Sequence, residues 1–344
     1  MDRTAITLAV LSAALFGASS PASKPLLDHF SSNQLAGLLY LGAALGILPW
    51  ALRGSVRTPW RMDAKNRRYL LGAVVFGGVL GPVLVLLGLK VASAASISLW
   101  LNLELVATAV LGALFFRDSL ARGGWTATGV AALAAVLLAW GEGASGVYAA
   151  ALVALACVCW GLDNQLTSLI DGIAPADSTL WKGLVAGGTN LLIGLSLAPW
   201  SGTLMETGRA LAIGALCYGV SIVLYITAAQ RLGATRSQII FSTAPFFGVL
   251  LSIGTLGEKL SWLHAVSGGL FVCALSLLAM EKHHHVHAHE PLEHEHRHRH
   301  GDGHHDHEHS GTRAAEEHTH RHAHEAHEHA HPHWPDLHHR HRHR

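Results

Sequence analysis

The sequence has few charged residues and few cysteines, and both shortages restrict the kind of protein it encodes. Only 14% of the 344 residues are charged, whereas 50% are hydrophobic. Residues 1–280 therefore carry too few charges to cover the surface of a soluble domain. The 4 cysteines lie within apolar segments, where a small soft side chain packs against a neighbour, and they imply no disulfide. A soluble helical protein is disfavoured because its buried helices would lack amphipathic partners.

Apolar segments fill residues 1–280, and each is near the roughly 20 residues that a helix needs to cross hydrocarbon. The segments are Ala5–Ser20, Leu35–Trp50, Tyr69–Leu89, Ala94–Phe116, Trp125–Trp140, Val147–Trp160, Leu180–Trp200, Ala210–Ala229, Ile239–Leu256 and Trp262–Met280. We predict an all-α integral membrane protein with ten transmembrane helices. The first segment is expected to stay in the protein, since Arg3 is its only preceding basic residue and a signal peptide needs a more basic start.

The distribution of Lys and Arg predicts the orientation in the bilayer. With a cytoplasmic N-terminus, 11 basic residues fall on the cytoplasmic side and 4 on the other, and Lys182 lies within a span. This asymmetry places both termini in the cytoplasm, and we expect the bacterial inner (plasma) membrane. Lys182 is interpreted as a snorkelling residue at the start of a helix.

An internal repeat divides the apolar part of the chain. Phe16-Gly17 recurs as Trp160-Gly161, and Arg117-Asp118 recurs as Gly257-Glu258, at offsets of 144 and 140 residues. Five helices per copy is an odd number, so the second copy enters the membrane from the opposite face. We predict two inverted five-helix repeats, residues 1–140 and 141–280, followed by a tail, residues 281–344. Inverted repeats are typical of secondary transporters, whose substrate lies where the halves meet.

These patterns resemble the EamA-like branch of the drug/metabolite transporter superfamily. Its characteristic stretch is a helix with a Glu-Pro or Ala-Pro step and, about three turns later, a Gly-Glu at the exit. The second copy matches with Ala244-Pro245 and Gly257-Glu258, whereas the first copy has Leu105 where proline is usual and Arg117-Asp118 at the exit. The resemblance implies a cavity lined by the first, third and fourth helices of each half.

Polar residues within these helices are the candidate site, because an acid within a span is costly unless it faces protein or water. Glu104 is the first candidate, for carrying a proton, binding a cationic cargo or coordinating a cation; a merely structural acid is the alternative. Asp163 is assigned either to the cavity or to a solvated helix end. The full set for substrate or coupling is Glu104, Asp163, Asn102, Trp100, Ser19, Tyr218, Tyr225, Gln238 and Thr243. Pro21, Pro82 and Pro245 are expected hinges, because proline removes a helix hydrogen bond.

The glycine pairs Gly42/Gly46, Gly77/Gly81 and Gly183/Gly187 are spaced for close helix contact within the bundle.

The tail is rich in histidine, with 25 of the 27 histidines after residue 280. Imidazole mixed with carboxylate suits Zn, Ni or Co, while the tail's lack of cysteine argues against soft ions. The tail cannot build a core and is expected to be disordered without metal. The expected metal ligands are His283, His284, His285, His287, His289, His294, His296, His298, His300, His304, His305, His307 and His309. A tail that senses pH or only solvates is the alternative.

The sequence leaves three functional classes open. It favours a secondary transporter of small solutes, of the metabolite efflux type, with a metal-binding tail that regulates or buffers. The alternatives are a Zn, Ni or Co exporter whose tail captures the ion, and a membrane-tethered metal store. No nucleotide-binding loop, catalytic triad or spaced metalloenzyme motif occurs, so an enzyme or a primary pump is not expected. The expected partners are the bilayer, a small-molecule or ion cargo and divalent metals, with no required cofactor and no nucleic acid.

Overall fold

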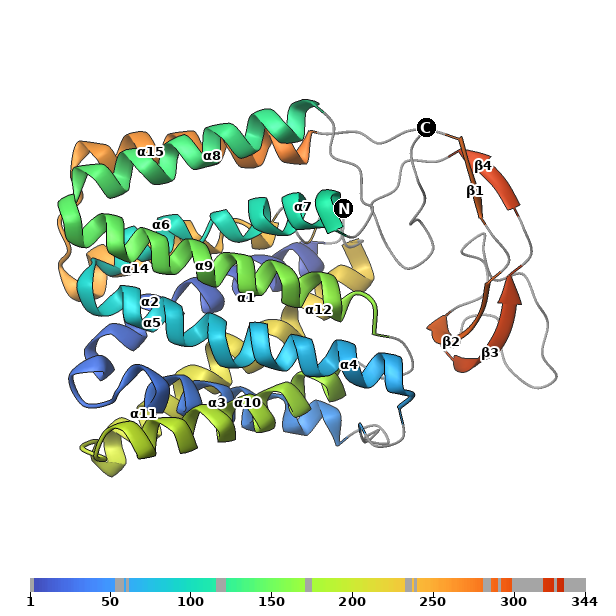
Figure 1. The fold of residues 1–344 in the computed structure, drawn as a ribbon, viewed down its shortest axis with the longest axis horizontal. Helices are drawn as coiled ribbons and strands as arrows, with labels where there is room; N and C mark the ends of the chain where they lie inside the picture. Colours follow the sequence, from blue (N-terminus) through green and yellow to red (C-terminus); the bar gives the residue numbers. More distant parts are fainter. Residues whose placement is uncertain are drawn as a thin grey trace.

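The computed structural model of the chain describes residues 3–52, 59, 62–115, 122–170, 175–232, 237, 240–280, 286–289, 292–298, 318–324 and 327–330. The described residues between 3 and 280 form a bundle whose helices run along its whole length (Figure 1).

The first repeat contains five membrane-length helical runs, three of which change geometry along their length. The elements are α1 Arg3–Gly17, α2 Ser19–Ser23, η1 Lys24–Asp28, α3 Ser32–Ala51, α4 Ala64–Ala73, η3 Val74–Leu80, α5 Gly81–Val91, α6 Ala94–Trp100, α7 Leu103–Phe115 and α8 Arg122–Gly141.

The second repeat follows the same plan. Its elements are α9 Gly143–Thr167, α10 Pro175–Leu197, α11 Leu204–Ile213, η4 Gly214–Val220, α12 Ser221–Leu232, α14 Ala244–Leu256 and α15 Trp262–Ala279. Within the described residues, 9 helical runs are long and apolar enough to cross a membrane, and Ala244–Leu256 is a shorter apolar helix. The prediction of a helical membrane protein built from two inverted repeats is confirmed.

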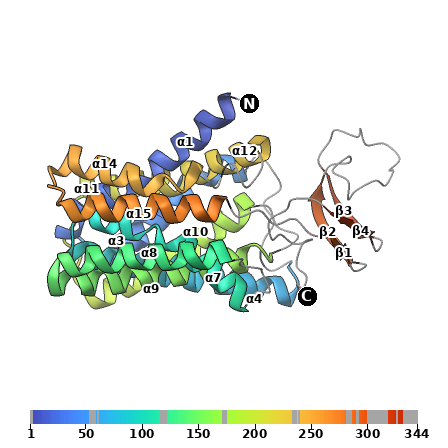
Figure 2. The same cartoon turned by 90° about the horizontal axis from the view of Figure 1, so that it is seen from above.

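Each repeat contributes its first helix to the other half of the bundle. Helix α1 packs against α12 and α14 of the second repeat, whereas α9 packs against α5 and α7 of the first. We call α4, η3, α5, α6, α7 and α9 the first body, and α1, α2, η1, α11, η4, α12 and α14 the second body. Two pairs, α3 with α10 and α8 with α15, flank them on opposite sides (Figure 1), and Figure 2 views the bundle from the side of α8 and α15.

The two ends of the bundle carry different segments of the chain. The end that we call proximal carries the start of α1 and the end of α15, which lie on the same side of the bundle (Figure 1). The opposite end, which we call distal, carries the turns at Phe30, at Ala92–Ser93 and at Glu142, together with Gly257 and Glu258, which follow α14.

Glycines let the helix backbones approach closely where the repeats meet. A Cβ on Gly17 would lie 2.2 Å from the Ala244 carbonyl oxygen, and one on Gly161 would lie 3.0 Å from the Thr108 nitrogen. These two glycines are the repeat positions recognised in the sequence. Each allows the first helix of one repeat to contact the fourth helix of the other closely. Close packing of this kind, enabled by small residues, is how helices associate in lipid.

The third helical run of each repeat contains a π-helical segment at an equivalent place. Segments η3 and η4 each span 7 residues, and their bounds are 140 residues apart. A π-helix is rare and is frequently found at functional sites. The fourth run of each repeat is interrupted as well, at Leu101–Asn102 and at Ser242–Thr243. Only the second interruption is followed by a proline, so proline is not what breaks the first.

The described part of the tail forms two antiparallel two-stranded ladders. Strand β1 Val286–His289 pairs with β4 His327–Ala330, and β2 Leu292–His298 pairs with β3 His318–His324. A two-stranded ladder alone is only marginally stable in water. Such pairing is consistent with a segment whose composition cannot supply a hydrophobic core.

The α3–α10 contact provides a matched test of this packing. A Cβ on Gly187 would lie 2.7 Å from the Leu41 nitrogen, whereas one on Gly188 would have no atom within 4 Å. We expect Gly187→Ala to destabilise the protein by about 1–3 kcal/mol, because backbone must shift to admit the methyl group. Gly188→Ala should leave the melting temperature unchanged or slightly raised, since alanine favours helix. Thermal unfolding in detergent measures both, and equal melting temperatures would contradict the packing argument.

Candidate functional site

Glu104 lies at the start of α7 and is held by the neighbouring helix α9. Asn164 Nδ2 donates to Glu104 Oε1 at 3.1 Å and to Thr108 Oγ1 at 3.2 Å. Glu104 is partly exposed and Asn164 is exposed. An exposed amide and a partly exposed carboxylate within membrane-length helices belong beside water or cargo, because lipid solvates neither.

Asp163, one residue before Asn164, is buried and forms an ion pair with Lys182 of α10. Lys182 Nζ lies 2.7 Å from Asp163 Oδ1 and 2.5 Å from Oδ2, and Thr167 Oγ1 donates to Oδ1 at 3.0 Å. The interpretation of Lys182 as a snorkelling residue is therefore wrong. Its side chain is only 18% exposed and it neutralises a buried acid.

Side chains from three other helices bond backbone carbonyls within the π-helical segment η3. Tyr40 Oη donates to the Gly77 oxygen at 2.6 Å, and Trp160 Nε1 donates to the same oxygen at 3.0 Å. Asn190 Nδ2 donates to the Gly78 oxygen at 3.1 Å. Pro82 has no N–H to offer these carbonyls four and five residues before it, which explains why they need other donors.

Gly77 also sets the position of the ion pair. A Cβ at this residue would lie 1.9 Å from Asp163 Oδ2. The Asp163 carboxylate thus occupies the space that a side chain at position 77 would take. The sequence signal for this site is the Gly77/Gly81 pair, whose spacing by itself indicates only helix packing.

Aromatic rings from the second body, from α3 and from Phe241, which precedes α14, form a cluster beside these polar groups. Tyr218 lies 5.9 Å from Tyr40 and 5.8 Å from Phe16, measured between ring centroids. Phe241 lies 5.2 Å from Phe16 and 5.0 Å from Tyr225. The Tyr218 side chain hydrogen-bonds Ser19. The structure therefore brings the predicted residues Ser19, Tyr218 and Tyr225 together around Phe16 and Phe241.

Three other predicted residues donate hydrogen bonds to backbone carbonyls. Trp100 is fully buried and donates from Nε1 to the Ala135 oxygen at 3.2 Å, and Asn102 donates to the Leu99 oxygen within its own turn at 2.9 Å. Thr243 is exposed, and its hydroxyl donates to the Ile240 oxygen at 2.6 Å.

The expected hinge prolines lie at or near changes of helix geometry. Pro82 is the second residue of α5, which follows η3. Pro245 follows the interruption at Ser242–Thr243, and Pro21 is buried in α2. Their role as hinges stays a prediction. Gln238 lies outside the described residues, as do Arg117-Asp118, the first copy of the exit motif.

No metal site is found in the part of the chain that the structure describes. There, no group of three or more His, Cys, Asp or Glu side chains could hold an ion. Metal binding by the tail stays a prediction, because only the backbone is described for five of its expected ligands, His287, His289, His294, His296 and His298. The other expected ligands lie outside the described residues: His283, His284, His285, His300, His304, His305, His307 and His309.

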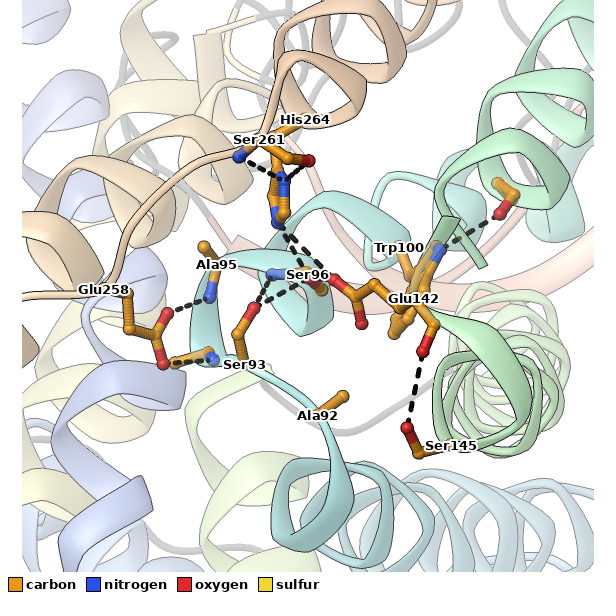
Figure 3. Close-up of polar contacts among 12 residues, drawn as sticks. Ala92, Ser93, Ala95, Ser96, Trp100, Glu142, Ser145, Glu258, Ser261 and His264 are labelled. Carbon is orange, nitrogen blue, oxygen red and sulfur yellow. Dashed lines mark hydrogen bonds and ion pairs between the residues drawn. The ribbon is translucent and has the colours of Figure 1, made fainter. Parts of the chain in front are cut away.

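A polar network joins helices at the distal end of the bundle (Figure 3). Ser96 Oγ of α6 contacts His264 Nε2 of α15 at 3.0 Å and donates to Glu142 in the turn between α8 and α9. His264 Nδ1 lies 2.9 Å from Ser261 Oγ, which fixes the ring. This network links the fourth helix of the first repeat to the fifth helix of the second.

Two further charged side chains of the second body reach the first body at the distal end. Glu258 accepts hydrogen bonds from the Ala94 and Ala95 nitrogens, both at 2.8 Å (Figure 3). Lys24 Nζ donates to the Leu89 oxygen at 3.2 Å and also to the Ala92 oxygen. In the sequence, Lys24 is informative only for membrane orientation and Glu258 only as part of a motif.

Paired and interrupted helices around a polar cluster are the architecture of a membrane transporter. Two matches to the EamA-like transporter family, over residues 3–140 and 147–280, show that the chain belongs to this family.

The chain is also similar to individual proteins. It is 26% identical over 286 residues to an uncharacterized transporter of Methanothermobacter thermautotrophicus (strain Delta H), covering 76% of this chain and 82% of that protein. A solved crystal structure of a protein aligns with a TM-score of 0.59 at 15% identity, covering 82% of this chain and all of the other, which supports the fold alone.

The Asp163–Lys182 pair can be tested by a double-mutant cycle. Lys182→Met should destabilise the protein by about 3–5 kcal/mol, because it leaves a buried carboxylate without a counter-charge. Asp163→Asn combined with Lys182→Met should recover much of that loss, since no uncompensated charge remains. Thermal unfolding measures the cycle. Losses that simply add would mean that the two groups are not coupled in the folded protein.

Proposed function

We propose that this membrane transporter of small solutes is an efflux protein that works by alternating access. The observation that carries the proposal is the partly exposed Glu104, held by Asn164 beside the buried Asp163–Lys182 pair. The titratable carboxylate would carry a proton, and the aromatic cluster around Phe16 would provide a binding surface for a small organic cargo.

The packing of the helices supports a conformation that admits cargo at the proximal end. In the distal half, α6 of the first body packs on α14 of the second. In the proximal half, the strongest partners of α7 among the described elements are α8 and α9, and those of α12 are α1 and η4. With a cytoplasmic N-terminus in the bacterial inner membrane, as the basic residues favour, cargo would enter from the cytoplasm.

The histidine-rich tail is proposed to bind Zn, Ni or Co and to regulate transport or buffer the ion. Its dense imidazole and carboxylate groups are the support for metal binding. Metal-driven ordering of the tail would favour either the open or the closed state of the membrane-spanning part, residues 1–280. Organic cargo is favoured over metal cargo because the described body offers no cluster of three metal-binding side chains.

Glu104→Gln tests the role of the carboxylate. The change keeps volume and hydrogen bonding but removes the proton-carrying group, so we expect most transport to be lost and its pH dependence to flatten. Uptake of candidate solutes into liposomes, measured against external pH, is the assay. Asp63→Asn is the matched control, since Asp63 is an exposed acid that caps α4. Normal flux with a normal pH profile would make Glu104 a structural acid.

Removal of residues 281–344 tests the tail. Truncation after Met280 should leave residues 1–280 folded. Binding of several Zn or Ni ions, measured by calorimetry, should be lost. Unchanged stoichiometry would place the metal sites elsewhere.

The same truncated protein separates organic cargo from metal cargo. In liposomes loaded with a metal-sensitive dye, it should pass no Zn, Ni or Co. Robust metal flux that disappears in the Glu104→Gln variant would instead support a metal exporter. A full-length protein that binds metal but moves no solute would support a membrane-tethered metal store.

A further inference from the structure

We infer that Lys24 and Glu258 form a clamp that closes the distal end by holding the α5–α6 hairpin from both sides. This inference rests on the proposed transport function. It assigns a role to two charged residues that the cargo site does not use.

The clamp holds two consecutive helices of the first body. Helix α5 ends at Val91 and α6 begins at Ala94, so the hairpin between them presents free carbonyls on one side and free N–H groups on the other. Lys24 occupies the carbonyl side, at the Leu89 and Ala92 oxygens. Glu258 occupies the N–H side, at the Ala94 and Ala95 nitrogens.

The chemistry of each partner fits its side of the hairpin. An ammonium group has only donors and a carboxylate has only acceptors, so Lys24 matches the carbonyls and Glu258 matches the amides. Hydrogen bonds in which one group is ionised are shorter and stronger than neutral ones. Both side chains are half-buried, so water competes with these bonds less than it would at an open surface.

The position of the clamp gives it a mechanical role. Lys24 lies in η1, which continues the run of α1, and Glu258 directly follows α14, so both belong to the second body. The hairpin belongs to the first body. An outward-open state requires the two bodies to separate at the distal end, and this separation must break both contacts. The strength of the clamp therefore contributes to the population of that state, together with the Ser96–His264–Glu142 network and the packing of α6 on α14.

Ser98 provides a reporter of distal opening. It lies on α6, is 1% exposed, and its Oγ would be 2.4 Å from a Cβ on Gly248 of α14. Ser98→Cys places a nearly isosteric thiol at this contact between the bodies. In lipid nanodiscs without cargo, its rate of modification by a water-soluble thiol reagent reports separation of α6 from α14. The parent protein gives the background from Cys273, which is exposed.

In the Ser98→Cys protein, Glu258→Gln or Lys24→Met should raise the modification rate about tenfold each, the change that about 1.4 kcal/mol of lost closure produces. Asp63→Asn, which removes a carboxylate cap within a single helix, should leave the rate unchanged. Size-exclusion profiles and thermal unfolding confirm that each variant is folded. A folded Glu258→Gln variant with the unchanged rate would overturn the clamp.

A charge exchange distinguishes the clamp from a simple ion pair between the two residues. Lys24→Glu with Glu258→Lys would restore a mutual attraction, but it would place an acceptor at the carbonyls and a donor at the amides. We expect the exchanged protein to remain open, with a rate at least as high as in either single variant. Recovery of the slow rate would show that only the mutual attraction matters.

Modification rates and solute flux together separate the clamp from the proposed function. Faster modification in the variants, with no solute moved by the parent protein, would support the clamp and refute transport. Solute transport by the parent protein, with modification rates that neither substitution changes, would support transport and refute the clamp.

Discussion

The constraint on which this structure depends is that a backbone group inside a bilayer must find its hydrogen-bond partner within the protein. The chain departs from regular helix at η3 and η4 and at the interruptions near Asn102 and Thr243. At η3, the oxygens of Gly77 and Gly78 are bonded by the side chains of Tyr40, Trp160 and Asn190. The irregular backbone therefore fixes where polar side chains must gather. It is the reason that the candidate site lies beside η3.

The same constraint joins the two repeats. Tyr40 comes from the second helix of the first repeat, whereas Asn190 comes from the second helix of the other. Both reach the π-helical segment, and their helices α3 and α10 pack closely through glycine. Lys182, also on α10, neutralises Asp163 on α9. Helix α10 therefore stabilises the polar side of the first body, although it is not part of that body.

Sequence could predict the fold because hydropathy and repeat spacing are local signals. Gly17 and Gly161 were recognisable as equivalent, and the structure places them at equivalent contacts. The polar contacts were harder to predict, since the partners of Asp163 and Gly77 are 19 and 37 residues away and depend on helix rotation. A lysine within a span reads as a snorkelling residue until its partner is known. The break at Asn102 was also missed, because no proline marks it and the chain there bends through its own turn, with Asn102 bonding Leu99.

The distal end shows why a transporter can tolerate charges that contribute little to its core. Lys24 and Glu258 each bond two backbone groups of the α5–α6 hairpin. These two hydrogen bonds offset the cost of desolvating each charge. These hydrogen bonds favour the state that is closed at the distal end. Because they are few, they can all break in one opening step. The same end is also closed by the packing of α6 against α14, and all seven residues of α6 are buried. The directed polar bonds of the clamp add to this closely packed contact, so they adjust the balance between the closed and open states and do not carry closure alone.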